Sequence, residues 1–150
     1  MALCMKAKDY FRMIQRAEGK LRILQAKLRH FEDLGVISAS TGTAIGNRQK
    51  GTSRVEMAAV GMVDSTRALQ AEIERYSAIV RDAEEVIASI HSETFQKILT
   101  LHYLCDMSLR SISDELKYKD PNSVYRAHGW ALAEAQKIIN EREIKNDIIR

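Results

Sequence analysis

Hydrophobic positions near the start of the chain follow a seven-residue repeat. Steps of four and three residues connect Tyr10, Ile14, Ala17, Leu21, Leu24, Leu28 and Phe31. This spacing places one narrow apolar stripe along a helix. The stretch contains no proline, and Gly35 lies where a helix C-cap is expected. We therefore predict a helix near residues 6–34.

A second stripe with the same spacing predicts a helix near residues 56–90. Its positions are Met62, Thr66, Leu69, Ile73, Tyr76, Val80, Ala83, Ile87 and Ile90. Two heptad helices joined by a loop can fold back into an antiparallel, coiled-coil-like hairpin. The second stripe is longer than one partner of 22 residues covers. We therefore expect the protein to be a homodimer held by these helices.

Residues 36–54 connect the two stripes and are rich in Ser, Thr and Gly. They carry Arg48, Lys50 and Arg54 but no acidic residue. We predict a mobile loop, the first segment that a protease cleaves, because its composition offers little to bury. It is either a plain linker or a basic arm that touches nucleic-acid phosphates.

The last third of the chain has a different rhythm, with three shorter helices predicted near 92–104, 108–117 and 120–140. Ser92 and Ser108 each stand where an N-cap is expected. Asp120 is a third N-cap, and Pro121, the single proline, takes the first helical position, where its missing N–H costs nothing. Three helices with a tight turn before the last are typical of a helix-turn-helix domain.

The predicted organisation is thus an all-α protein with two parts. Residues 1–90 form a helical hairpin used for oligomerisation, and residues 91–150 form the helix-turn-helix domain. The formal net charge is +3. It is unevenly placed, with +7 in residues 1–54, −4 in residues 55–90 and 0 in residues 91–150. Opposite charges on the two heptad helices favour their pairing.

The last predicted helix has two contrasting faces when it is projected at about 100° per residue. The inward face carries Val124, Ala131, Ala135 and Ile138, and the outward face carries Asn122, Arg126, Gly129 and Ala133. An amide can pair with adenine and a guanidinium with guanine in the major groove of DNA. We therefore predict that residues 121–139 form a recognition helix for double-stranded DNA.

The remaining candidate DNA contacts surround this helix, mostly as phosphate ligands. They are Ser108, Arg110, Lys119, Ser123 and Tyr125. Trp130 flanks the outward face and is expected to pack against a neighbouring helix, while His128 is expected to be a structural histidine. Because residues 91–150 are neutral, we expect weak binding by one subunit that dimerisation strengthens.

The segment from Lys97 to Leu132 resembles the DNA-binding region four of bacterial sigma factors. The matching positions are Tyr103, Ile112, Ser113, Leu116, Val124, Ala131 and Leu132. Phage late-gene regulators of the ArpU and RinA type share this sigma-like end, an Arg-x-His matched by Arg126 and His128, and a helical N-terminal half. The chain departs from the family pattern at Ser113, which replaces the usual Ala, and in the turn Tyr118–Pro121. The resemblance implies a phage or prophage transcriptional activator that contacts a host RNA polymerase.

Two other functions fit the same pattern. A small terminase subunit, which packages phage DNA, also joins a helix-turn-helix to an oligomerising hairpin, although usually in the opposite order. A helical adaptor would use the corner to bind a protein and would bind no DNA. The number of subunits in solution separates the first alternative from a dimeric regulator, and a DNA-binding assay separates the second.

Enzymatic chemistry is not expected from this sequence. The four histidines are scattered, and "GTAIGNRQKG" lacks the Gly-Lys-Ser/Thr ending of a phosphate-binding loop. We predict no catalytic site, no cofactor and no metal. With two isolated cysteines, no membrane-length apolar run and no signal-peptide stretch, a cytoplasmic location is expected.

Overall fold

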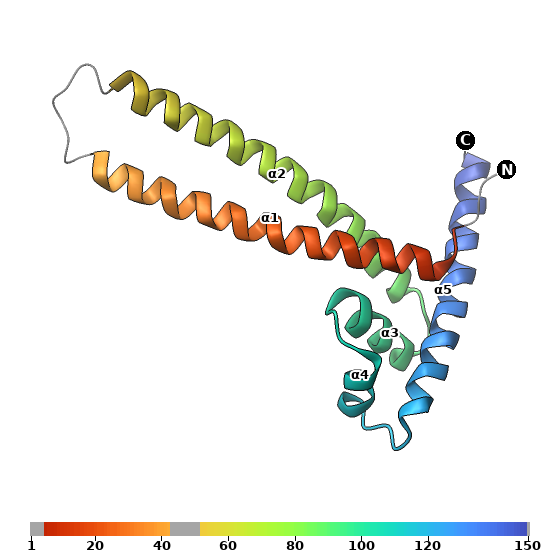
Figure 1. Ribbon diagram of the computed structural model, residues 1–150. Helices are drawn as coiled ribbons and strands as arrows, with labels where there is room; N and C mark the ends of the chain where they lie inside the picture. The colour runs from red at the N-terminus through yellow and green to blue at the C-terminus, as the bar shows by residue number, and fades with distance from the viewer. Residues whose placement is uncertain (1–4, 43–51, 150) are drawn as a thin grey trace. The chain divides into compact units, whose positions relative to one another are not determined.

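The structure is a computed structural model that describes residues 5–42 and 52–149. Every regular element in these two ranges is helical, so the predicted all-α class is confirmed. The elements are α1 (Ala7–Gly42), α2 (Thr52–Ala88), α3 (Glu93–Leu99), the π-helix η1 (Thr100–Leu104), α4 (Leu109–Glu115) and α5 (Pro121–Ile149) (Figure 1). None of the helices in the described ranges has the length and hydropathy to cross a bilayer.

Three predicted boundaries differ from the observed ones. Gly35 does not end α1, which continues to Gly42, and α2 already begins at Thr52. The predicted loop 36–54 is therefore helical over 36–42 and 52–54, and the rest of it lies outside the described residues. Glycine weakens a helix without forbidding it, and no proline follows to stop α1. Similarly, α5 continues beyond residue 140 because no breaker follows in its sequence.

The chain divides into two compact units. The first unit contains Met1–Glu18 and Ala78–Arg150, and the second contains Gly19–Ser77. This division differs from the predicted boundary at residue 90, because the start of α1 and the end of α2 share a core with the helices that follow.

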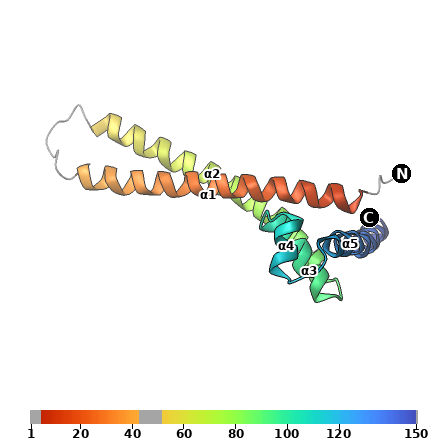
Figure 2. The ribbon, with the colours of Figure 1, turned by 60° about the horizontal axis from the view of Figure 1, so that its bottom comes forward.

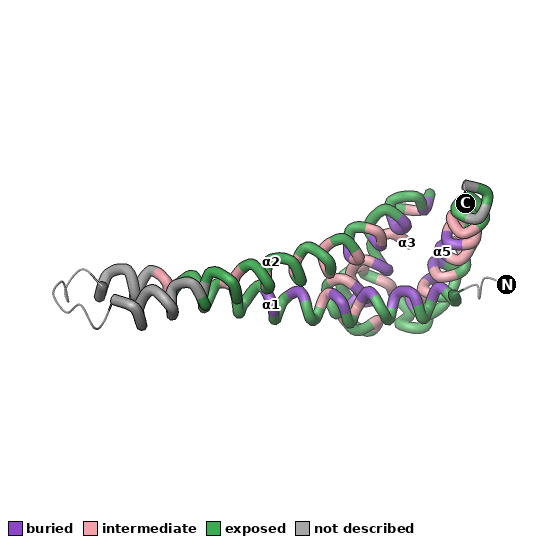
Figure 3. The backbone as a smooth tube through the Cα atoms, turned by 90° about the horizontal axis from the view of Figure 1, so that it is seen from above, coloured by how far each residue is buried: buried purple, intermediate pink, exposed green. Residues whose placement is uncertain are grey.

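The main core of the first unit brings together side chains from five elements. Phe11 and Ile14 of α1, Ala83 and Val86 of α2, and Leu99 of α3 are almost completely buried. The same cluster includes Ala7, Tyr10, Ile87, Ile90, Tyr103, Ala131, Ala135 and Ile139. Figure 3 shows buried bands along helices whose other faces are exposed. Burial of this apolar surface is the main force that holds the first unit together.

A second core cluster lies between α3, α4 and α5. Ile98, Ile112 and Val124 have no exposed surface, and Ala127 is 5% exposed. Partly buried Phe95, Leu101, Met107, Leu109, Leu116 and Tyr118 surround them. Figure 2 shows α3 and α4 beside α5, and this cluster fixes the corner between α4 and α5.

The second unit consists of the later part of α1 and the earlier part of α2, which run side by side in opposite directions (Figure 1). Leu21 and Leu24 are buried. Across the pair, the Lys20 ammonium donates to the Tyr76 hydroxyl at 3.2 Å and lies 5.4 Å from the centre of the Tyr76 ring. Leu21, Leu24 and Tyr76 are predicted heptad positions, whereas Lys20 lies beside the predicted stripe of α1.

Candidate nucleic-acid interface

The corner between α4 and α5 is built by two side-chain caps and one unusual backbone conformation. The Ser108 hydroxyl accepts a hydrogen bond from the Ser111 N–H at 3.1 Å at the start of α4. The chain leaves α4 through Lys117, whose φ is +59°. Asp120 then accepts a bond from the Asn122 N–H at 3.0 Å, and Pro121 is the first residue of α5. The predicted capping roles of Ser108 and Asp120 are therefore confirmed.

Replacing Lys117 with glycine is expected to raise the free energy of unfolding by up to about 1 kcal/mol. A left-handed conformation costs an L-residue about 1–2 kcal/mol, and the entropic cost of glycine, about 0.5–1 kcal/mol, offsets part of the gain. Lys117→Val should be destabilising, because a β-branched residue tolerates positive φ poorly. Urea unfolding of both variants measures the difference, and equal stabilities would contradict the assignment of strain to this residue.

Most of the predicted DNA contacts are on the surface. Arg110, Lys119, Asn122, Tyr125 and Arg126 are exposed. The basic groups of Arg110, Lys119 and Arg126 have no ion-pair partner in the described part of the chain. Each is therefore available to an anionic partner.

The two serines differ from the other candidates. Ser108 is exposed, but its hydroxyl is already engaged with the backbone and side chain of Ser111. Ser123 is partly buried, and its N–H donates to the Asp120 carbonyl at 3.0 Å. Ser108 therefore caps α4 with its side chain, whereas Ser123 contributes to the first turn of α5 through its backbone.

The outward face of α5 is as small and open as its sequence predicts. Asn122 and Arg126 lie one helical turn apart, and Gly129 and Ala133 continue their face. All four are exposed, and a Cβ atom added at Gly129 would meet no atom within 4 Å. The packing of the described residues therefore leaves room for a larger side chain at position 129. What the glycine provides is a helix surface that a partner can approach closely.

The prediction that Trp130 packs against a neighbouring helix is wrong for the described fold. Its side chain is 61% exposed, on the edge of the outward face of α5. Tyr125, on the other edge, is 53% exposed. Two large aromatic side chains thus flank Asn122 and Arg126 without a covering element among the described residues.

Behind the outward face, three polar aromatic side chains form a cluster that the sequence did not reveal. The His102 Nδ1–H donates to the Met107 carbonyl at 2.7 Å, and the His102 and His128 rings are 5.2 Å apart. Burial, followed by the nearby His102 and Lys8, lowers the pKa of His128 to about 4. His128 is therefore neutral near pH 7, and its Nε2 is hydrogen-bonded to the Tyr103 hydroxyl at 2.9 Å.

This cluster predicts a loss of stability in mild acid. In the unfolded chain His128 has a pKa of about 6.5, above its folded value of about 4. Its neutral form therefore stabilises the fold fully above pH 6.5, and the contribution declines as the pH falls towards 4. Because the ring is only half buried, solvent reduces the size of the effect.

The expected result is a falling midpoint of thermal unfolding between pH 7.5 and 5.5, measured by circular dichroism. His128→Gln keeps a hydrogen-bond acceptor but cannot titrate, so its midpoint should fall less over the same range. If the midpoints of the wild type and of His128→Gln fell equally with pH, protonation of His128 would not be the cause of the loss of stability.

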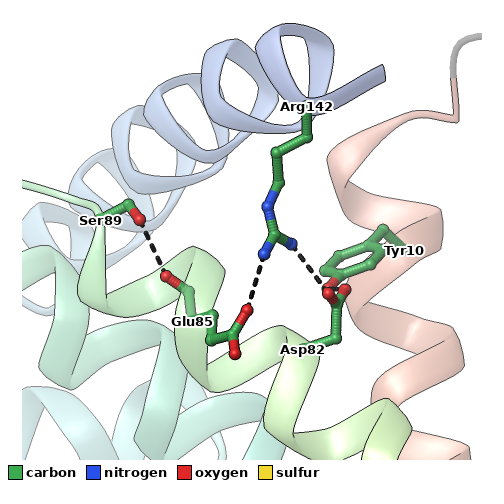
Figure 4. A network of polar contacts seen from close by, with 5 residues as sticks. All are labelled: Tyr10, Asp82, Glu85, Ser89 and Arg142. Atoms are coloured by element: carbon green, nitrogen blue, oxygen red, sulfur yellow. Dashed lines mark hydrogen bonds and ion pairs between the residues drawn. The ribbon is translucent and has the colours of Figure 1, made fainter. Parts of the chain in front are cut away.

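A second polar network joins the start of α1, the end of α2 and the second half of α5 (Figure 4). The Tyr10 hydroxyl donates to Asp82 Oδ2, and Arg142 donates to Asp82 Oδ1 at 2.9 Å and to Glu85 Oε2 at 2.9 Å. Burial and the Asp82 carboxylate raise the pKa of Tyr10 above its ordinary value. The three elements are thereby fixed in register beside the main core.

Two shallow grooves lie in the first unit, and neither is lined by Asn122, Arg126, Gly129 or Ala133 of the outward face of α5. One, of about 470 Å³, is lined by residues that include His91, Lys137, Glu141 and Lys145. The other, of about 670 Å³, is lined by residues that include Ile87, Leu101, Leu104 and Leu116. In the described residues, no group of three or more His, Cys, Asp or Glu side chains is arranged to hold a metal ion.

Comparisons with known proteins do not add to this picture. No protein-family model, curated protein or solved structure matches the chain.

Proposed function

We propose that the protein is a sequence-specific, double-stranded DNA-binding transcriptional regulator. The observation that carries the proposal is the start of α5, where Asn122 and Arg126 share an exposed face. Asp120 and Pro121 start the helix at a defined residue, and the cluster around Ile112 and Val124 fixes its angle to α4. In this proposal α4 and α5 are the two helices of a helix-turn-helix.

Base recognition follows from the chemistry of these two side chains. The Arg126 guanidinium can donate two hydrogen bonds to the O6 and N7 atoms of guanine, and the Asn122 amide can pair with the N6 and N7 atoms of adenine. Gly129 and Ala133 continue the same face with little side-chain volume, which lets the helix enter the major groove closely. Residues 121–139 are long enough to cross the groove, because they span about 28 Å.

Phosphate contacts come from the surroundings of the corner. Arg110 and Lys119 are exposed and have no ion-pair partner in the described ranges. The Tyr125 hydroxyl is on the surface beside the recognition face. Such contacts orient the protein on the duplex, while the base contacts determine the sequence.

The wider identity of the regulator rests on the sigma-like resemblance. It favours a phage or prophage late-gene activator that acts with host RNA polymerase. In this proposal the heptad helices, which pair within one chain, also hold two subunits together. A two-fold dimer of this kind prefers inverted half-sites about one helical turn of DNA apart, or a multiple of that distance.

One observation favours a second function, that of a helical adaptor that binds a protein. Trp130 is 61% exposed and Tyr125 is 53% exposed, and aromatic residues are enriched at protein interfaces. In this alternative the outward face of α5 binds an apolar partner surface, and the small residues let a partner helix approach.

Selection of bound sequences from random duplex DNA, at a defined salt concentration, tests the proposal. We expect a consensus that contains guanine and adenine within one half-site, and light scattering that indicates a dimer. An absence of enrichment at low salt would reject the DNA-binding function and leave the adaptor. A ring of many subunits would indicate a packaging protein instead.

A further inference from the structure

The first turns of α1 present a basic edge on the surface of the first unit. Lys8 and Arg12 are four residues apart and therefore project on the same side of the helix. Both side chains are exposed, and neither has a hydrogen-bond or ion-pair partner among the residues that the structure describes. We call this pair the Lys8–Arg12 edge.

The start of α1 is held directly against α5. The Gln136 side chain accepts a hydrogen bond from the Ala7 N–H at 2.6 Å and donates to the Met5 carbonyl at 3.1 Å. Gln136 thereby replaces part of the backbone hydrogen bonding that the start of a helix lacks. Figure 1 shows the beginning of α1 next to α5. The basic edge therefore has a defined position relative to α5.

The ring cluster places the edge beside the first half of α5. Phe11 stacks on Tyr103 with ring centres 5.1 Å apart, and Tyr103 is hydrogen-bonded to His128. Lys8 lies near enough to lower the pKa of His128, and Arg12 near enough to lower that of Tyr103 against the raising effect of burial.

The side of α5 that receives α1 adjoins its outward face. His128, Leu132 and Gln136 are spaced by four residues and form one row along the helix. Tyr125 lies seven residues before Leu132 and continues this side towards the start of the helix. Lys8 therefore lies near His128 on the side of α5 that Tyr125 continues, and Arg12 lies near Tyr103, whose hydroxyl contacts His128.

The net charge of the proposed DNA-binding segment gives the position of Lys8 and Arg12 a functional importance. Residues 91–150 are electrically neutral, whereas DNA binding depends strongly on the neutralisation of phosphates. Residues 5–18 add Lys6, Lys8, Arg12 and Arg16 against Asp9 and Glu18. In the structure, this positively charged segment lies beside α5, which belongs to the neutral segment 91–150.

We propose that Lys8 and Arg12 bind backbone phosphates that border the major groove entered by α5, so that α1 is part of the DNA-binding surface. The inference rests on the proposed DNA-binding function. It assigns to α1 a second role besides packing in the core. These contacts add affinity for any sequence and carry no base preference.

The double variant Lys8→Gln, Arg12→Gln tests the inference in the full-length protein. The logarithm of the dissociation constant is measured against the logarithm of salt concentration for the selected duplex and for an unrelated one. The control is Lys97→Gln, Lys145→Gln, which removes two exposed charges from the grooves beside Ala88 and Ser89. Thermal unfolding verifies that both variants remain folded.

We expect the Lys8–Arg12 variant to reduce the salt slope by about 2, since each neutralised phosphate contributes about 0.9. Both duplexes should be weakened equally, and the control should keep the wild-type slope. If the Lys8–Arg12 variant kept the wild-type salt slope, the inference would be wrong. It would also be wrong if the control lost as much salt slope as the Lys8–Arg12 variant. Neither result would contradict the proposed DNA-binding function. A wild-type protein that binds neither duplex overturns the proposed function and the inference with it.

Discussion

Replacing Phe11 with alanine is expected to lower the free energy of unfolding by about 3–5 kcal/mol, the usual cost of removing a buried phenyl ring. Phe11 has no exposed surface, stacks on Tyr103 at 5.1 Å and meets the edge of Tyr10 at 5.2 Å. The cavity would open between α1 and the helices that follow residue 90. Urea unfolding followed by circular dichroism measures the loss.

Met13→Ala is the matched control for this prediction. Met13 belongs to the same helix two residues later, but its side chain is 40% exposed. Its replacement should change stability by no more than about 0.5 kcal/mol. Similar losses in the two variants would mean that α1 does not belong to the core of the first unit.

The same packing predicts the behaviour of a fragment. Residues 91–150 contain the whole predicted helix-turn-helix, but Leu99, Tyr103, Ala131, Ala135 and Ile139 share their cluster with residues of α1 and α2. Removing residues 1–90 exposes this apolar surface to water. We therefore expect the fragment to lack a cooperative unfolding transition, and a sharp two-state transition in it would show that the smaller cluster around Ile112 and Val124 suffices.

The features of the fold that the sequence predicted correctly depend on neighbouring residues. A helix begins at a capping side chain because that group satisfies N–H donors two or three residues later. Ser92, Ser108 and Asp120 are therefore recognisable without knowledge of the fold, and each accepts the expected backbone bond. The faces of α5 follow from helical periodicity for the same reason.

The features that the sequence did not reveal depend on residues far apart in the chain. Phe11 lies off the heptad stripe, and it is buried because α1 packs against more than one element, which widens the apolar face beyond two positions in seven. The bonds from Tyr10 and Arg142 to Asp82 connect three helices, and no local pattern indicates them. The hydrophobic pattern changes near residue 90, whereas the main core cluster contains residues from both sides of that position.

The candidate site likewise has features that local sequence predicts and features that depend on distant residues. Exposure of Asn122 and Arg126 follows from the inward positions of Val124, Ala127 and Ala131, so periodicity alone predicts it. The exposure of Trp130 was missed, because an apolar residue beside a buried row is usually covered by a neighbour. No local pattern indicates that Lys8 lies near His128, because the start of α1 is held against α5 by Gln136, more than 120 positions later in the chain.

Arg126→Ala is expected to weaken binding to the selected duplex by about 1–3 kcal/mol, or roughly 5- to 150-fold, and to relax the preference at one base position. In the proposed complex, the loss would arise because the guanine acceptors that pair with the guanidinium are left without that partner. Arg126→Lys should recover the charge but little of the base preference, since an ammonium cannot form the planar two-bond contact. Competition binding against duplexes with each base at that position measures both effects.

Lys119→Ala removes a positive charge from the turn before α5. Comparison with this variant distinguishes the loss of a base contact from the loss of a phosphate contact. Because Lys119 precedes the capped start of the helix, we expect it to contact phosphate, so its loss should weaken all duplexes alike and reduce the salt slope by about 1. If Arg126→Ala behaved in the same way as Lys119→Ala, Arg126 would be a phosphate ligand and the recognition face would lie elsewhere. If Arg126→Ala changed neither affinity nor preference, α5 would not be the helix that enters the groove, and the exposed Trp130 edge would favour a protein partner instead.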